Sequence, residues 1–290
     1  MSLDRRKFLH GLGAGTLAAL AGGASAVAAP ATTAGLPAFA NTGADAFWRA
    51  VRAQYPLLED PVYLNTGGLG PASQRVLDAV ADTMRRLQEH SETGHAHFEP
   101  ARETLGRFLG AQPAEICFVR NATEGNSIVA AGLALKAGDE VIFESHAHPG
   151  GSYPWLNQAR QRGVVVRVFE PDHSSPEANL ARIRELVTPR TRVIQVSHIT
   201  CTTGLVMPVA AIAEFARARG IWFHVDGAQS AGMIPLDLAA LGCDSYAFSG
   251  HKWLGGPHES GVFYLRRDRL DEVAPTGIGA YSGELGLLPG

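Results

Sequence analysis

The sequence contains few lysines and few cysteines. Of its 25 basic residues, only Lys7, Lys136 and Lys252 are lysines, so few amines are available for imine chemistry. The three cysteines are widely spaced and odd in number, which argues against a disulfide framework. Cys117 and Cys243 have apolar, strand-like neighbours, and we interpret both as small core residues.

A strong charge of either sign is also missing. The net charge is −3 and no basic run occurs, so the sequence offers no electrostatic basis for binding nucleic acid. With 46% apolar residues in a chain of 290, the composition is that of an ordinary globular protein. This length suffices for one large domain with a substantial core and a smaller appendage.

The first thirty residues have the layout of a signal peptide. Arg5 and Arg6 precede a weakly apolar Ala/Gly/Leu stretch with small-x-small sequences near its end, and the pair resembles the twin-arginine type. A membrane anchor or an amphipathic helix is the alternative, but the abundance of Gly and Ala disfavours a stable anchor. We expect residues 1–29 to direct export to the periplasm and residues 30–46 to form a flexible mature N-terminus.

From residue 47 onward, short apolar segments alternate with helical patterns. This alternation is typical of a mainly parallel α/β sheet buried on both faces. The pattern predicts strands at residues 116–119, 140–143, 164–169, 193–196, 221–225, 245–248 and 261–265, and helices at 72–90, 99–109, 124–135, 154–162, 176–187, 208–219 and 236–241.

Asp226 directly follows the predicted strand at residues 221–225. Ligands of open α/β sheets collect at the carboxyl ends of strands. A carboxylate there is costly unless it has a partner. Asp226 therefore either caps a helix or forms a salt bridge, or it keeps a pyridine nitrogen protonated.

Lys252 follows the next strand, at residues 245–248. The residues between Asp226 and this strand suffice for a crossover, so both strands should end at the same sheet edge. A lysine after a strand is ordinarily a solvated surface charge. Because the other two lysines lie in the signal and in a polar turn, Lys252 is the one amine placed for chemistry. Desolvation favours its neutral, nucleophilic form or an imine.

Two further segments carry polar groups at strand ends. Thr123 can cap the helix that follows it, and backbone N–H groups there can bind an anion. Capping without a ligand is common, but Ser249 and His251 as further donors make a phosphate the better explanation. His146 and His148 could be two metal ligands, yet no further ligand cluster supports a metal, so none is predicted. We favour an imidazole stacked on an aromatic cofactor ring.

Together these residues resemble the class V aminotransferase family, the pyridoxal-phosphate (PLP) group that includes cysteine desulfurases and isopenicillin N epimerase-like proteins. The most specific segments are His224-Val225-Asp226-Gly227-Ala228-Gln229 and Ser249-Gly250-His251-Lys252. The resemblance begins near Tyr63 and implies a PLP-transferase type I large domain over residues 47–290. Its fold class is α/β, with a mainly parallel, mixed seven-stranded sheet sandwiched by helices. We expect the small C-terminal domain to be largely missing.

The resemblance also implies roles for single residues. Lys252 would form the Schiff base and later move the Cα proton, Asp226 would pair with the pyridine nitrogen, and Gln229 would contact the ring hydroxyl. Desulfurases place an asparagine where this chain has Cys201, which favours the epimerase-like branch. The other implied cofactor contacts are the stacking ring of His148 and the phosphate ligands Ala122, Thr123, Ser249 and His251.

The implied activity is the conversion of an amino acid through an external aldimine and a Cα carbanion, of aminotransferase or epimerase type. Cysteine desulfurase or C–S lyase is the alternative within the family. A non-catalytic exported PLP-binding remnant is the alternative of another class, because the arginine for the substrate carboxylate is expected beyond Gly290. The expected partners are an amino-acid substrate, a second copy in a homodimer, and the twin-arginine export machinery, without nucleic acid or a stable membrane span.

Replacing Arg5 and Arg6 with lysine should leave the protein inside the cell, because lysines lack the recognition features of the twin-arginine pair. Fractionation of cells expressing each form measures the periplasmic yield. An unchanged yield of the double variant would refute the twin-arginine assignment.

Overall fold

The computed structural model describes residues 43–279. The predicted signal peptide and nearly all of the predicted flexible N-terminus lie outside these residues. Helix α3 (Ala44–Arg52) belongs to a compact unit separate from the chain that follows Ala53, and it buries none of its side chains. The predicted start of the large domain, residue 47, falls inside this helix.

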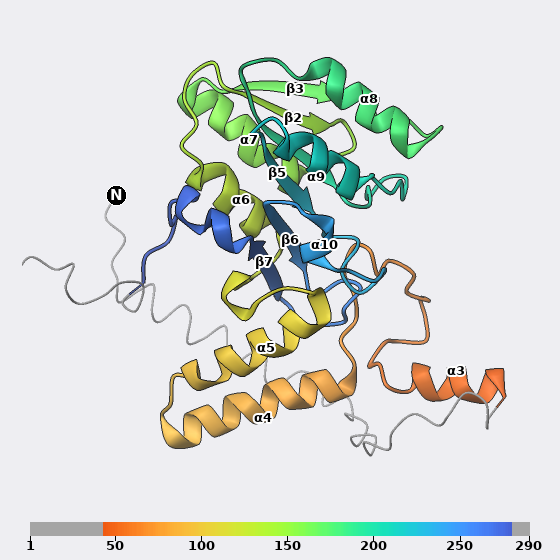
Figure 1. Cartoon of the computed structure of the whole chain (residues 1–290). Helices are drawn as coiled ribbons and strands as arrows, with labels where there is room; N and C mark the ends of the chain where they lie inside the picture. The colour runs from red at the N-terminus through yellow and green to blue at the C-terminus, as the bar shows by residue number, and fades with distance from the viewer. Residues whose placement is uncertain (1–42, 280–290) are drawn as a thin grey trace, which may run out of the picture. The chain divides into compact units, whose positions relative to one another are not determined.

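A mixed sheet of seven strands forms the centre of the main unit (Figure 1). The strand order is β1-β7-β6-β5-β4-β2-β3; β7 runs antiparallel to both neighbours, and the other pairs are parallel. The prediction of a mainly parallel, mixed seven-stranded sheet is therefore confirmed. The strands are β1 (Ile116–Val119), β2 (Glu140–Glu144), β3 (Val165–Phe169), β4 (Thr191–Ser197), β5 (Trp222–Asp226), β6 (Ser245–Ser249) and β7 (Gly261–Leu265).

The helices begin and end within a few residues of the predicted positions, with one larger difference. Short 3-10 turns, which the apolar spacing did not indicate, precede α5 and β1 and follow β7. The helices of the main unit are α4 (Gln74–His90), η1 (His95–His97), α5 (Phe98–Leu109), η2 (Pro113–Glu115), α6 (Ala122–Gly132), α7 (Pro149–Arg162), α8 (Pro176–Leu186), α9 (Val209–Arg217), α10 (Leu238–Leu241) and η3 (Arg267–Glu272).

The larger difference concerns α7, which begins at Pro149 rather than at the predicted residue 154. His148 is its N-cap and Pro149 occupies the first turn, where a missing N–H costs nothing. The paired glycines at 150 and 151 hid this start from the sequence pattern. Pro154 leaves the Gly150 carbonyl without its helical donor, and Asn126 of α6 donates to that carbonyl at 3.2 Å.

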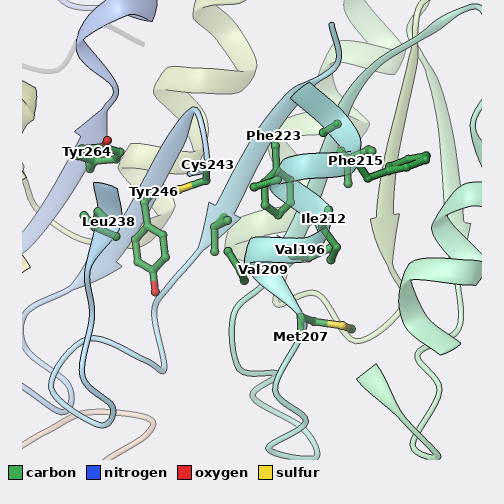
Figure 2. Close-up of a cluster of buried hydrophobic side chains, with 14 of the residues drawn as sticks. Val196, Met207, Val209, Ile212, Phe215, Phe223, Leu238, Cys243, Tyr246 and Tyr264 are labelled. Atoms are coloured by element: carbon green, nitrogen blue, oxygen red, sulfur yellow. The ribbon is translucent and has the colours of Figure 1, made fainter. Parts of the chain in front are cut away.

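Each face of the sheet packs against its own set of helices. Phe223 and Tyr246 point to the face covered by α5, α8, α9 and α10, where Figure 2 shows them among the buried side chains. Trp222 and Ala247, one position away along the same strands, point to the opposite face, which α6 and α7 cover. Since successive side chains of a strand alternate between faces, His224 and Asp226 also lie on the α6 side.

The three cysteines are all free in the structure. Cys243 is fully buried, as predicted, and burial raises the pKa of its thiol to about 12. The prediction for Cys117 was wrong: this residue is exposed. It lies on the edge strand β1. There it lines a hollow of about 620 Å³, which residues of α6 and β7 also line. An apolar neighbourhood in sequence therefore did not ensure burial at the sheet edge.

Within residues 43–279, no helix has both the length and the apolar content needed to cross a bilayer. The same part of the chain contains no group of three or more His, Cys, Asp or Glu side chains arranged to hold a metal ion. His146 instead pairs with Glu170 at 3.2 Å.

Candidate active site

The predicted Asp226–Lys252 pair lies at the carboxyl edge of the sheet. β5 ends at Asp226, which is in register with Ala247 of the parallel strand β6. β6 ends at Ser249, and Lys252 follows three residues later. The prediction that two neighbouring parallel strands release these residues at one edge therefore agrees with the observed topology.

A cavity of about 360 Å³ opens at this edge and contains four of the predicted site residues: His148, Cys201, Gln229 and Lys252. A smaller recess shares these four and adds Asp226. A volume near 360 Å³ is at the lower end of the range for small-molecule sites. The loop at residues 65–68, absent from the predicted set, lines the larger cavity.

Asp226 is a buried carboxylate, with 5% of its surface exposed. Its Oδ2 accepts a hydrogen bond from Asn126 Nδ2 at 2.8 Å, and its Oδ1 accepts one from the Ala228 N–H at 3.0 Å. No described side chain forms an ion pair with it. A buried carboxylate with hydrogen bonds but no ion-paired side chain favours a ligand that brings a positively charged N–H.

Behind Asp226, a chain of hydrogen bonds runs along the α6 face. Trp222 Nε1 donates to Ser245 Oγ at 3.0 Å, and Ser245 Oγ lies 2.8 Å from His224 Nδ1. His224 Nε2 lies 2.8 Å from Asn126 Oδ1, on the other side of the Asn126 amide from Asp226. All these groups lie on one sheet face because the strand positions alternate.

The Asp226 end of this chain fixes the position of its hydrogens. A carboxylate only accepts, so the Asn126 amide turns its nitrogen to Asp226 and its oxygen to His224 Nε2. The His224 proton therefore lies on Nε2. Burial lowers the pKa of His224 to about 3, so the ring remains neutral and its Nδ1 accepts from the Ser245 hydroxyl. The Trp222 indole donates to the oxygen of the same hydroxyl.

Lys252 is half-buried, and burial lowers the pKa of its amine, although Asp226 and Cys201 act in the opposite direction. The loop before α4 packs closely against it. Gly70 donates its N–H to the His251 carbonyl at 2.7 Å, and a Cβ added at Gly70 would lie 1.9 Å from the Lys252 carbonyl oxygen. Only glycine allows this approach, so the loop is fitted to the lysine segment.

The turn after Asp226 depends on a second glycine. A Cβ at Gly227 would lie 1.9 Å from the Tyr246 ring. The Tyr246 hydroxyl bonds to Ser230, in the same turn, and lies 2.8 Å from His198 Nδ1. The fully buried Tyr246, which Figure 2 shows among the core side chains, therefore supports the turn that follows Asp226.

The predicted anion site lies at the start of α6, but its capping residue differs from the prediction. The N-cap is Asn121, whose side chain accepts from the Glu124 N–H at 3.0 Å, and not Thr123, because the helix begins two residues earlier than expected. The Ala122 N–H donates to Ser249 Oγ at 3.0 Å. The Thr123 N–H, in the first turn at the positive end of the helix, has no acceptor among residues 43–279.

The remaining predicted residues occupy two places. His148 caps α7 by accepting the Gly150 N–H on Nδ1 at 3.0 Å, and it also lines the cavity. Cys201 is exposed at the cavity mouth; local burial of the thiol raises its pKa, with Lys252 opposing. His251 is buried next to Ser260 and His258 and does not belong to the described lining of either cavity.

Sequence reasoning missed several residues that hold this site together. No role was predicted for Ser245, Asn126 was only the last residue of the segment around Thr123, and His224 was quoted only as part of the segment around Asp226. The signal for His224 and Ser245 was available in the alternation of β5 and β6, which places every second residue of a strand on the α6 face. Asn126 lies on α6 itself. No role was predicted for Trp253, which directly follows Lys252; its indole N–H donates to Gln229 Oε1.

Glu144, at the end of β2, was also missed. It is completely buried; its Oε1 accepts the Ser197 N–H at 2.8 Å, while its Oε2 has no partner among the described residues. Ser197 in turn lines the recess that contains Asp226. Burial raises the pKa of Glu144 to about 7, and the nearby Asp226 charge adds to this.

Comparison with known proteins relates this site to characterised enzymes. The model of the family named aminotransferase class V matches residues 63–284. Isopenicillin N epimerase of Streptomyces clavuligerus is 35% identical over 238 residues, covering 80% of this chain and 60% of the epimerase. A probable cysteine desulfurase of Methanothermobacter thermautotrophicus is 34% identical over 237 residues, covering 79% and 59%. The chain thus spans about 60% of the length of these curated relatives.

Solved structures show the same fold. A mutant of C-DES with glycine covalently linked to its PLP cofactor has a TM-score of 0.71 and 32% identity, covering 79% of this chain and 62% of that one. The Escherichia coli cysteine desulfurase CsdA has a TM-score of 0.71 and 30% identity, covering 80% and 61%. The predicted type I fold of the large domain is confirmed by these matches.

Glu144 gives the stability of the protein a specific pH dependence. Between about pH 4.5 and pH 7 the folded protein keeps a proton that the unfolded chain has released, so Glu144 lowers stability as the pH rises through this window. Between pH 5 and pH 8, the unfolding free energy of the wild type should therefore fall by about 2 to 3 kcal/mol more than that of Glu144→Gln, which lacks the titrating carboxyl group. Urea titrations at several pH values measure the difference.

The matched control is Glu185→Gln, because Glu185 is an exposed carboxylate on α8. Its stability should follow the wild-type pH dependence. Parallel curves for the wild type and Glu144→Gln would show that Glu144 is ionised throughout.

Proposed function

Because the chain belongs to the class V aminotransferase family, we propose that it binds pyridoxal phosphate at Lys252 and uses it to convert an amino acid. The observation that carries this proposal is the shared recess of Lys252 and Asp226, at the ends of two paired parallel strands. In this recess one ligand could contact both the Lys252 amine, whose pKa is lowered by burial, and the buried Asp226 carboxylate, which forms no ion pair with a described side chain.

The residues present fit the functional groups of this cofactor. An aldehyde suits the Lys252 amine, and a pyridine nitrogen suits the Asp226 carboxylate, which still lacks a cationic partner among the described side chains. The free Thr123 N–H and the Ser249 hydroxyl, at the positive end of α6, suit a phosphate. His148 suits the aromatic ring face, and Gln229 suits the ring hydroxyl.

The bound cofactor would supply an electron sink for the electrons of a broken Cα bond. The residues of this chain perform the other tasks. Lys252 Nζ would hold the aldehyde carbon, with water as the leaving group, and as a free amine the same atom would take and return the Cα proton. Asp226 holds a proton on the ring nitrogen, and Asn126, fixed by His224, holds Asp226 in place. His148 and the loop at residues 65–68 line the cavity on the side of the substrate and cofactor and would orient them there.

Within the family, we favour an epimerase or aminotransferase activity. Cys201 supports this choice, because it lines the cavity where the resemblance to desulfurases calls for an asparagine. The sequence similarity itself is almost equal, at 35% to an isopenicillin N epimerase and 34% to a probable cysteine desulfurase. Cysteine desulfurase activity therefore remains the second candidate, and a cofactor-binding protein without turnover is the third.

The cofactor assignment predicts a visible absorbance band for the protein purified with PLP. Lys252→Ala should lose the band that depends on the covalent link, while Lys136→Ala, at an exposed turn lysine, should keep it. Borohydride reduction followed by peptide mass analysis should place the cofactor on Lys252. A wild type that gains no band, or a label on another residue, would overturn the proposal.

The activity predicts exchange of an amino-acid Cα hydrogen with solvent. In D₂O the wild type should incorporate deuterium at Cα, with inversion or amino transfer, and Lys252→Ala should lose this exchange by several orders of magnitude. NMR of the recovered amino acids measures it. Release of sulfide or alanine from cysteine would favour the desulfurase alternative instead. Cofactor binding without exchange or release would favour the non-catalytic one.

A further inference from the structure

The side-chain amide of Gln229 lies between two fixed hydrogen-bonding groups. Its Oε1 accepts the indole Nε1–H of Trp253 at 2.7 Å, and its Nε2 donates to the Gly67 carbonyl at 2.9 Å. The three residues come from three separate segments: the turn after β5, the loop after β6 and the loop before α4. All three line the cavity that contains Lys252.

The chemistry of the partners determines which way the amide points. An indole N–H can only donate and a backbone carbonyl can only accept. The amide oxygen must therefore face Trp253, and the amide nitrogen must face Gly67. The reversed amide would place its N–H₂ against the indole N–H and its oxygen against the Gly67 carbonyl, leaving both partners unpaired.

Close packing strengthens this arrangement. A Cβ added at Gly67 would lie 3.2 Å from Gln229 Oε1 and 3.4 Å from the Trp253 ring. Little room is left for the amide to move. One hydrogen of Nε2 is used by Gly67, and the second has no acceptor among residues 43–279. Gln229 also lines the smaller recess beside Asp226 and Lys252.

We propose that Trp253 is a positioning residue, which holds the Gln229 amide so that the cavity is offered an N–H donor and not a carbonyl acceptor. The ligand atom at this place must then be an acceptor, and the ionised ring oxygen of pyridoxal phosphate is such an atom. This inference rests on the proposed function. Trp253 itself acts only through Gln229 and reaches no reacting atom.

The test is Trp253→Phe, which keeps an aromatic ring and removes the N–H. With one anchor lost, PLP affinity should fall about threefold to tenfold. A donor to the ring oxygen stabilises its ionised form, so losing its alignment should move the pH midpoint of the visible absorbance of bound PLP upward by about half a unit. A spectroscopic pH titration and a PLP titration measure both quantities without turnover.

A double-mutant cycle separates positioning from general damage. If Trp253 acts through Gln229, Trp253→Phe should cause no further midpoint shift in a Gln229→Ala background. The matched control is Trp155→Phe. Trp155 donates its indole N–H to Gln195, whose Nε2 donates to the Gly151 carbonyl, the same arrangement outside the cavity lining. This control should lower stability and leave the midpoint unchanged.

The outcomes distinguish this inference from the proposed function. A wild type without a PLP band would refute the proposed function and the inference with it. A wild type with the band, combined with an unshifted Trp253→Phe, or with a shift that persists in Gln229→Ala, would refute the role of Trp253 alone.

If Trp253→Phe does not fold, Gln229→Glu carries the test. The carboxylate can still accept the Trp253 indole N–H but can no longer donate, so PLP affinity should fall at least tenfold while that indole hydrogen stays protected from exchange. NMR measures the protection, with the Trp253 signal assigned by elimination from phenylalanine variants of the other tryptophans. Unchanged affinity or an unprotected indole hydrogen would overturn the inference.

Discussion

The site depends on one constraint, the burial of the Asp226 carboxylate at the end of β5. A charge in this position is costly unless hydrogen bonds and a cation compensate it. The protein supplies the hydrogen bonds, through Asn126 and the Ala228 N–H, but no described cationic side chain lies within ion-pair distance of the carboxylate, and Lys252 interacts with it only from farther away. The surrounding structure can be understood as a means of keeping this carboxylate in place until a ligand brings the positive charge.

The sequence predicted this arrangement well at the level of strands. Short apolar segments alternating with helical patterns gave seven strands, and the crossover after Asp226 placed Lys252 beside it. These features follow from local rules, because burial on both faces and the spacing of crossovers leave direct marks on the sequence. The cavity residues His148, Gln229 and Cys201 came instead from the resemblance, and the cavity contains all three.

The features that the sequence did not predict arise from contacts between distant segments. Asn126 and Asp226 are joined across 100 positions, and Gln229 and Gly67 across 162. No local pattern reveals such a pair. The errors have the same origin. Cys117 is exposed because no other segment covers the edge strand at this position. Asn121 is the cap instead of Thr123 because α6 begins earlier than its apolar spacing indicated.

Obligatory donors and acceptors set the polarity of the site from two sides. Asp226 fixes the amide of Asn126, whose oxygen accepts from His224, and the Trp253 indole with the Gly67 carbonyl fixes the amide of Gln229. Asn126 therefore presents an N–H to Asp226, and in our proposal Gln229 presents one to the cavity. On the proposed function, these fixed directions match what the cofactor would present, a ring N–H for Asp226 and an acceptor oxygen for Gln229.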